Sequence, residues 1–461
     1  AAVQGLFLGG ELHPEQLIPF AAVLVMGWGL YIFSIGILHR VSFEIETVAF
    51  LLSGLGIQLL SAFDLQGVTT QLAAMLLGVF LFSFLLWFMG DMDRVAKCRL
   101  WIGLGALGLL GLTLVFGSGA YGSKNWIYLG PLSVQPSEFV KICFIFVGTS
   151  TLDRLQTKKN IGEFLLFTGA CIGLLALMPD FGMALILFAT FLIIAFMRSG
   201  SVRTIALVLA GAVLAVLVVL TVKPYVLDRF MGWGHVWEDV NGVGYQQTRV
   251  LTYLASGGLF GLGLGSSYMG SVPAADSDLV FGLLCEEQGL LLGLVVLLAF
   301  VLWIFYARSD VTRSRSTFFS IAACAAAGML MFQTALNVYG ATDVLPLTGV
   351  TLPFISSGGS SLISVWGMMA FLKASDERTY AARRASRKSL RQDYAQPPAG
   401  AEGFLCRSPP RPAGERPRRP PALEGAAIPE GRPDPCAQLD SARWCFTCCW
   451  PPFWAGWATC W

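Results

Sequence analysis

Charged residues are scarce in this sequence. Asp, Glu, Lys and Arg make up 13% of its 461 residues, whereas a soluble domain carries roughly a quarter. The mean hydropathy is +0.66, and continuous apolar runs recur through roughly the first 375 positions. These runs exclude a water-soluble enzyme, and because they do not alternate they argue against a transmembrane barrel. The net charge of +2 gives no indication of nucleic-acid binding.

Metal-binding patterns and internal repeats are also lacking. Cys98, Cys143, Cys171, Cys285 and Cys324 are scattered singly, without the spacing of metal ligands. An inverted-repeat transporter has no positive support, because no internal repeat is visible. The first apolar run is long and has no basic segment before it, which argues against a cleaved signal peptide.

The apolar runs predict an all-α fold, a polytopic membrane helix bundle of about 11 transmembrane helices. The predicted spans are 17–38, 45–63, 70–90, 99–117, 136–153, 161–178, 181–197, 203–222, 279–307, 316–339 and 353–373. Basic residues fall in every second connection, which places the N-terminus outside and the C-terminus in the cytoplasm. A large outer loop, 223–278, precedes the ninth span. Within it we expect 244–265 to form an amphipathic or re-entrant segment.

Composition divides the chain into three parts. Residues 1–375 are the predicted transmembrane domain, and 376–392 form a basic cytoplasmic juxtamembrane segment. Residues 393–461 are rich in Pro and Arg and then in Cys and Trp, and we predict a disordered tail. We interpret this tail as a non-functional or frame-shifted extension that is dispensable for activity. The alternatives are a membrane-surface anchor and a weak metal site at its C-x-x-C.

Ionisable residues at the predicted outer membrane edge form a first candidate cluster. Glu138 lies in the first turn of a helix opened by Pro136, and Lys141 lies on the same face of that helix. Either the two residues form a neutralised pair that fixes the helix, or Lys141 is a cation poised for an anionic ligand. Asp180 lies at a tight turn, where we expect it to cap the next helix; an added role in the site is the alternative.

A second cluster lies where the large loop enters the ninth span. Asp276, Ser277 and Asp278 precede this span. Glu286 and Glu287 fall about 12 Å deeper along a helix. Capping of the helix explains one of these polar residues, but it does not explain four carboxylates so close together.

A third candidate is the segment 343–361. It contains two prolines and three glycines, and Ser356 and Ser360 lie near its end. This composition predicts irregular backbone at membrane depth. Such backbone persists only where protein or a polar cavity covers it.

Taken in order, these motifs resemble the SEDS family (shape, elongation, division and sporulation; the FtsW/RodA/SpoVE proteins). The resemblance rests on QPSEFVK, PDFG, SGGLFGLGLG, SDLVFGLLCEEQG and LPLTGVTLPFISSGGSS, between about residues 120 and 375. It implies a peptidoglycan glycosyltransferase of the bacterial plasma membrane that polymerises lipid II at the outer face. The implied partner is a class B penicillin-binding transpeptidase. Division, elongation and sporulation roles stay open, because an extra span precedes QPSE here.

The resemblance also implies roles for single residues. Asp278 matches the family's essential acid and is the catalytic candidate, as general base or as ligand of a divalent cation, Mg²⁺ or Mn²⁺. Lys141 and Arg249 are candidates for contact with the donor diphosphate, with Glu138 holding Lys141. Further candidates for substrate binding are Asp276, Ser277, Asp180, Glu287, Ser356 and Ser360. Asp276 stands where the family usually has His.

The alternative function is that of a lipid II flippase or another polytopic lipid transporter, and a pure scaffold is a third. A flippase needs a polar path through the bilayer. We expect the charges within the spans to cluster at the outer side, with the cytoplasmic half nearly free of them, which favours chemistry on an already flipped substrate. No organic cofactor and no nucleic-acid partner are expected.

Overall fold

The structure is a computed structural model that describes residues 7–8, 11–12, 17–36, 42–62, 64–119, 124–129, 132–153, 158–200, parts of 202–210, 233–314 and 317–376. All of these residues belong to one unit, Ala1–Ala385. The predicted tail lies outside the described residues, as does the juxtamembrane segment after its first residue.

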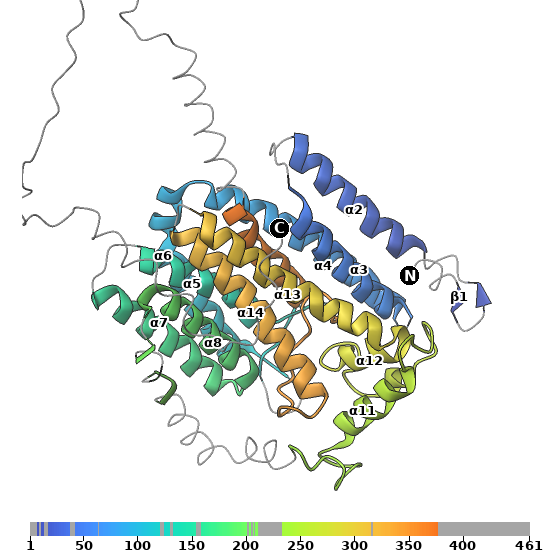
Figure 1. Cartoon of the computed structure of the whole chain (residues 1–461). Helices are drawn as coiled ribbons and strands as arrows, with labels where there is room; N and C mark the ends of the chain where they lie inside the picture. Colours follow the sequence, from blue (N-terminus) through green and yellow to red (C-terminus); the bar gives the residue numbers. More distant parts are fainter. Residues whose placement is uncertain are drawn as a thin grey trace, which may run out of the picture. The chain divides into compact units, whose positions relative to one another are not determined.

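Helices dominate the described chain (Figure 1). They are α2 (Leu17–Gly36), α3 (Glu44–Ser61), α4 (Leu65–Met89), α5 (Met92–Phe116), α6 (Pro136–Asp153), α7 (Lys158–Leu177), α8 (Phe181–Ser199), α11 (Tyr245–Gly257), α12 (Val280–Gln288), α13 (Leu290–Arg313), α14 (Thr317–Ala341) and a last helix over 359–376. Seven helices of the described chain, α2 to α5, α8, α13 and α14, are long and apolar enough to cross a membrane. The predicted all-α membrane bundle is therefore confirmed.

The predicted spans agree with these helices almost throughout. Ten of the eleven fall on described helices, and the eighth, 203–222, lies mostly outside the described residues. The amphipathic segment 244–265 is helical over its first half, as α11. Two short antiparallel hairpins complete the structure: β1 (Phe7–Leu8) pairs with β2 (Glu11–Leu12), and β3 (Ile127–Leu129) pairs with β4 (Leu132–Val134).

Helix α14 lies at the centre of the packing and contacts α6, α8 and α13 (Figure 1). Small side chains allow this close approach, as is usual between membrane helices. A Cβ atom at Gly328 of α14 would overlap the side chain of Ile193 in α8. Helix α2 lies at the edge of the bundle. Among the described helices, its main contacts are with α3 and α4.

The connection from α14 to the last helix folds into the protein instead of running over its surface. Leu352, Phe354 and Ile355 are buried in this segment, and a Cβ at Gly56 of α3 would overlap the backbone of Ile355. Gln71 of α4 holds both sides of the turn, because its amide donates to the Ser356 carbonyl at 3.1 Å and accepts from Gly358 N at 3.2 Å. The irregular backbone predicted here is thus covered by protein over 352–356, whereas Val344 and Gly349 are exposed.

The ninth predicted span is broken, which corrects the continuous helix expected over 279–307. The break falls at Gly289, whose φ of +87° ends α12 before α13 begins. The prediction missed the break because it joined the apolar runs on either side of Glu286, Glu287 and Gln288 into one span.

The glycine-rich loop after α11 pairs the backbone groups freed by this break. Leu262 N and Gly263 N donate to the last carbonyls of α12, at 2.9 and 3.0 Å. The carbonyls of Gly258 and Leu259 accept from the first N–H groups of α13, at 3.0 and 3.2 Å. Helix ends at membrane depth need such partners, so loop and half-helices form one interlocked element.

Substitution of a loop glycine tests this interlock. A Cβ at Gly261 would overlap the carbonyl oxygen of Glu287, whereas a Cβ at Gly263 would meet only Ser266 Oγ, at 4.0 Å. Both glycines have positive φ, of +83° and +102°, so alanine at either position has a similar cost from the unfavourable backbone conformation. We expect Gly261→Ala to destabilise the protein more than Gly263→Ala does, by about 1–3 kcal/mol for the overlap. Thermal unfolding in detergent measures both, and equal losses would contradict the interlock.

Candidate functional site

The site begins with the turn that carries Asp276, Ser277 and Asp278 into α12. All three side chains are partly exposed. The backbone carbonyls hold this turn: that of Asp276 accepts from Ser357 N at 2.8 Å, and that of Ser277 accepts from Ser356 Oγ at 2.6 Å. The carbonyl of Asp278 accepts from the Asn337 amide at 2.8 Å. The turn is therefore fixed through its backbone.

Asp278 does not occupy the capping position of the following helix. The N-cap residue of α12 is Leu279. The carboxylate of Asp278 instead lies beside Gly349, where a Cβ would come within 3.4 Å of Oδ2. Gly349 has a φ of +68°, so glycine there suits the backbone and also leaves room next to the acid.

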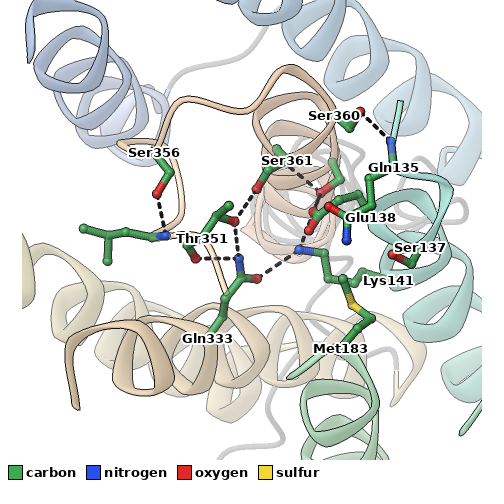
Figure 2. A network of polar contacts seen from close by, with 12 residues as sticks. Gln135, Ser137, Glu138, Lys141, Met183, Gln333, Thr351, Ser356, Ser360 and Ser361 are labelled. Atoms are coloured by element: carbon green, nitrogen blue, oxygen red, sulfur yellow. Dashed lines mark hydrogen bonds and ion pairs between the residues drawn. The ribbon is translucent and has the colours of Figure 1, made fainter. Parts of the chain in front are cut away.

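A buried polar network adjoins the segment 351–361 (Figure 2), which contacts this turn through Ser356 and Ser357. Lys141 Nζ is 2.6 Å from Glu138 Oε2 and donates to Gln333 Oε1 at 3.0 Å. Gln333 donates in turn to the carbonyl and hydroxyl oxygens of Thr351, at 2.9 and 3.2 Å. Ser364 donates to Glu138 at 2.8 Å, and Thr351 and Ser361 share a hydrogen bond of 2.8 Å. The network ties α6 and α14 to the segment that supports Asp278.

Lys141 and Glu138 form the pair expected from their spacing, and both are buried: Lys141 has no exposed surface and Glu138 is 4% exposed. The positive charge of Lys141 is thus neutralised inside the protein. Ser360 lies at the edge of the same network and accepts from Gln135 N at 3.0 Å (Figure 2). Ser356 is buried too, and its hydroxyl also accepts from Leu352 N at 2.7 Å.

Asp180 caps α8, as predicted. Its Oδ1 accepts from Met183 N at 3.1 Å, and its Oδ2 lies 3.5 Å from the hydroxyl of Ser137, next to Glu138 on α6. The pKa of Asp180 is raised to about 6. Burial is the main cause, and the nearby charge of Glu138 acts in the same direction, whereas the hydrogen bond from Met183 N lowers the pKa. The cap therefore belongs both to the fold and to the edge of the site.

This raised pKa predicts a pH-dependent stability. The folded state takes up the proton at a higher pH than the unfolded chain does, so protonation of Asp180 stabilises the fold as the pH falls from about 6 towards 4. Asp180→Asn keeps the cap, because Asn caps about as well as Asp, but it removes the carboxyl group that takes up the proton. We expect the gain in unfolding midpoint between pH 6.5 and 4.5 to be smaller in the variant than in the wild type. Equal gains would contradict the assignment.

Glu286 and Glu287 lie at the far end of α12 and hold the loop that precedes the turn. The carboxylate of Glu286 accepts from Tyr268 N and Met269 N, both at 2.9 Å. Glu287 Oε1 accepts from Gly265 N at 3.2 Å. Glu287 follows Asp278 by nine residues, about 13 Å at the rise of an α-helix, and its contacts give it a loop-holding position away from the turn.

Arg249 lies on α11, which packs against α12. Its guanidinium lies 5.3 Å from the ring centroid of Tyr245, a cation–π arrangement that leaves the group partly exposed. The site thus unites the turn, the supporting segment 343–361 and the buried pair.

The sequence analysis did not single out five residues that hold the site together: Gln71, Gln333, Thr351, Ser361 and Ser364. In the sequence the two glutamines are visible only as amides within apolar helices.

A second buried charged cluster lies at the opposite end of the last helix. Lys373 Nζ is 3.2 Å from Glu46 Oε1 and 3.7 Å from Asp376 Oδ2, and it donates to Ser42 Oγ at 3.0 Å. The expectation that the cytoplasmic half of the spans is nearly free of charges was therefore wrong. The sequence did not reveal it, because Glu46 and Lys373 lie far apart in the chain.

Comparison with known proteins identifies the family. Residues 40–380 match FTSW_RODA_SPOVE, described as "Cell cycle protein". The chain belongs to this family. The SEDS resemblance read from the motifs is thereby confirmed, and helix α2, at Leu17–Gly36, precedes the matched residues.

Relatives of the SEDS chain include several proteins named "Probable peptidoglycan glycosyltransferase FtsW". That of Buchnera aphidicola from Acyrthosiphon pisum is 34% identical over 265 residues, 55% of this chain and 66% of the relative. That of Tolumonas auensis is 37% identical over 293 residues, 60% of this chain and 75% of the relative. The stretch matched in the first of these relatives is thus about two thirds of its length.

Solved structures show the same fold. A chain of a peptidoglycan synthase complex, studied for the coordination of polymerization and crosslinking, is 26% identical with a TM-score of 0.63, over 73% of this chain and 98% of that chain. The rod shape determining protein RodA of Thermus thermophilus is 24% identical with a TM-score of 0.55, over 73% and 97%. The protein is therefore a multi-pass bacterial membrane protein with the fold of this family.

Proposed function

We propose that this protein is a peptidoglycan glycosyltransferase that polymerises lipid II into glycan strands during cell-wall synthesis. The observation that carries the proposal is the partly exposed Asp278 turn, held by its backbone above the buried Glu138–Lys141 network. A partly exposed carboxylate on a turn whose backbone is held in place suits transfer to a sugar hydroxyl. The names of the relatives and the fold of the synthase complex support the same reaction.

In the proposed reaction Asp278 is the general base. The 4-hydroxyl oxygen of the acceptor sugar attacks the anomeric carbon of the donor, and its proton passes to Asp278. The bond from that carbon to the diphosphate breaks, and its electron pair leaves with the diphosphate. One direct displacement of this kind inverts an α-linked donor to a β-linked product. A general base contributes about 10²–10⁴-fold to such a step.

The diphosphate needs positive charge nearby. Arg249 is the candidate for direct contact, because its guanidinium is partly exposed on α11. Lys141 is fully buried, so in this proposal it fixes the segment 343–361 under Asp278. Asp276 and Ser277 lie in the same turn and are proposed to contact the sugars, with Ser356, Ser360 and Asp180 supporting them from below.

A divalent cation, Mg²⁺ or Mn²⁺, is a second proposed use of Asp278. Among the described residues no group of three or more His, Cys, Asp or Glu side chains converges on one point. Asp278 would supply one carboxylate to such an ion, which would take most of its other ligands from the diphosphate, as Mg²⁺ often does. Such an ion would offset the charge of the leaving group; we assign no step of the reaction to it.

We propose that the site faces the outside of the cell membrane. The basic connections support this orientation. It predicts that a cysteine replacing the exposed His235 reacts with a membrane-impermeant maleimide added to intact cells, whereas one replacing the exposed Ser199 does not. Both are made in a background without reactive native cysteines, and lysed cells provide the control for reactivity. Labelling of Ser199→Cys alone would reverse the orientation.

A lipid II flippase is the alternative function. The buried charges of the described chain fall into three groups, around Glu138, around Lys373 and at Glu286 and Glu287, and the first two groups lie at opposite ends of the last helix. Between them lies an aromatic layer in which the ring of Trp366 packs against those of Phe50, Phe82 and Phe354, with centroids 4.8 to 6.0 Å apart. This layer interrupts a polar path and favours the polymerase.

The proposed partner is a class B penicillin-binding transpeptidase, as the synthase complex of similar fold suggests. The test incubates the purified full-length protein with labelled lipid II, alone and with such a transpeptidase whose own active site is blocked by a β-lactam. We expect glycan strands that a muramidase digests, and more of them with the partner present. Absence of strands under both conditions would reject the proposed function.

A further inference from the structure

A long apolar groove of about 530 Å³ lies between α2 and α3. Its walls are formed by two antiparallel helices, as shown by Tyr31 against Phe43 at one end and by Val23 beside Gly54 further along. The residues that line it are Pro19, Phe20, Val23, Leu24, Gly27, Trp28, Tyr31, Phe43, Thr47, Phe50, Leu51, Gly54, Leu55, Ile57, Gln58 and Ser61. Only one wall of the groove, α3, falls within the residues that match the family.

The surroundings of the groove decide what fills it. Both α2 and α3 are candidate membrane spans, and α2 buries only 17% of its apolar window against the rest of the protein. The groove therefore opens into the hydrocarbon of the bilayer, where water does not compete for an apolar surface. Its occupant is a hydrocarbon chain.

The length of the groove distinguishes between hydrocarbon chains. Its lining runs along α3 from Phe43 to Ser61, which is about 27 Å at the rise of an α-helix. The hydrocarbon layer is about 30 Å thick, so one acyl chain of a phospholipid reaches only about 15 Å. A groove that follows the full thickness suits a chain longer than one leaflet, such as a polyprenyl chain.

One end of the groove lies close to the candidate site. Gln58 and Ser61 give this end polar lining, whereas apolar residues dominate the rest. On the same stretch of α3, Gly56 touches the backbone of Ile355, next to Ser356, whose hydroxyl holds the Asp278 turn. A chain that leaves the groove at Ser61 thus emerges on the same helix that contacts the supporting segment of the site through Gly56.

We infer that this groove binds the polyprenyl chain of the lipid-linked sugar that the site uses. The inference rests on the proposed function and adds to it a binding site for the carrier lipid built by helix α2. The groove holds the chain alongside the site, so that a substrate with a full-length chain binds more tightly than one with a short chain.

Substitutions at two adjacent positions of α2 distinguish binding of a chain in the groove from a general effect on the lipid-facing surface. Leu24 lines the groove and is 47% exposed, whereas Val25 is 71% exposed and does not line it. On the opposite wall Leu51 lines the groove and is 54% exposed. Tryptophan at Leu24 and Leu51 fills the groove, and Val25→Trp adds the same bulk to the lipid-facing side of α2.

The experiment measures polymerisation of two lipid II analogues, one with a full-length polyprenyl chain and one with a farnesyl chain. For the full-length substrate we expect Leu24→Trp/Leu51→Trp to raise KM at least about tenfold, equivalent to about 1.4 kcal/mol. The same variant should leave the farnesyl substrate unchanged, and Val25→Trp should leave both unchanged.

Three other outcomes are informative. An unchanged KM for the full-length substrate would overturn the inference while leaving the proposed function intact, since strands still form. Equal losses with both substrates would also overturn it, because they indicate a general effect of bilayer lipid or of folding. Absence of strands from either substrate in the wild type would instead reject the proposed function itself.

Discussion

Replacement of Asp278 by Asn is expected to lower polymerisation of lipid II by at least about 10²-fold, the low end for a lost general base. The fold should survive, because the turn is held by its carbonyl oxygens, which accept from Ser357 N, Ser356 Oγ and the Asn337 amide. The substitution keeps the size of the side chain and removes its negative charge and basicity. Glycan product per unit of purified protein measures the loss.

Three controls accompany this variant: its amount in the membrane, its unfolding midpoint and its binding to the transpeptidase, all of which should match the wild type. A capping role is the competing explanation, but Leu279 occupies the cap of α12 and Asn caps about as well as Asp. Near-normal product from Asp278→Asn would therefore remove Asp278 from the chemistry and direct attention to Asp276 or Glu287.

Breaking the buried ion pair is the second change with a large expected effect. Lys141→Met leaves the carboxylate of Glu138 buried without its cation at 2.6 Å, and it also removes the donor to Gln333. Loss of one partner of a buried pair costs about 3–5 kcal/mol. We expect the variant to unfold at a much lower temperature in detergent and to accumulate poorly in the membrane.

A double variant separates stability from activity. Glu138→Gln/Lys141→Met removes both charges, keeps an acceptor for the Ser364 hydroxyl, and should recover most of the lost stability. Its polymerisation should stay below that of the wild type, because the bridge from Lys141 through Gln333 to Thr351 is still missing. If the double variant is as unstable as Lys141→Met, the cost does not come from an unpaired charge.

Much of the candidate site follows from the sequence because its residues sit in ordered motifs next to helix starts. Pro136 and Glu138 predict the first turn of α6, and the spacing to Lys141 predicts the ion pair that the structure shows. Asp180 precedes an apolar run, and it caps that run. Prolines and glycines in 343–361 predict an irregular segment, and the structure covers it with α3 and α4.

Other features depend on contacts between distant parts of the chain. The break at Gly289 exists because the glycine-rich loop pairs both helix ends, and no local pattern records that pairing. Gln333 and Gln71 are amides within mainly apolar helices, so only their partners show what they hold. The same limit hid the Lys373 cluster, which joins the start of α3 to the end of the last helix.

The most direct test of the central claim reconstitutes the wild-type protein in sealed vesicles with labelled lipid II and follows two products at once. Strands accessible to an externally added muramidase report polymerisation, and exposure of lipid II from the inner leaflet reports transport. We expect strands from the wild type, at least about 10²-fold fewer from Asp278→Asn, and transport no faster than in protein-free vesicles. Rapid transport without strands would instead establish the flippase.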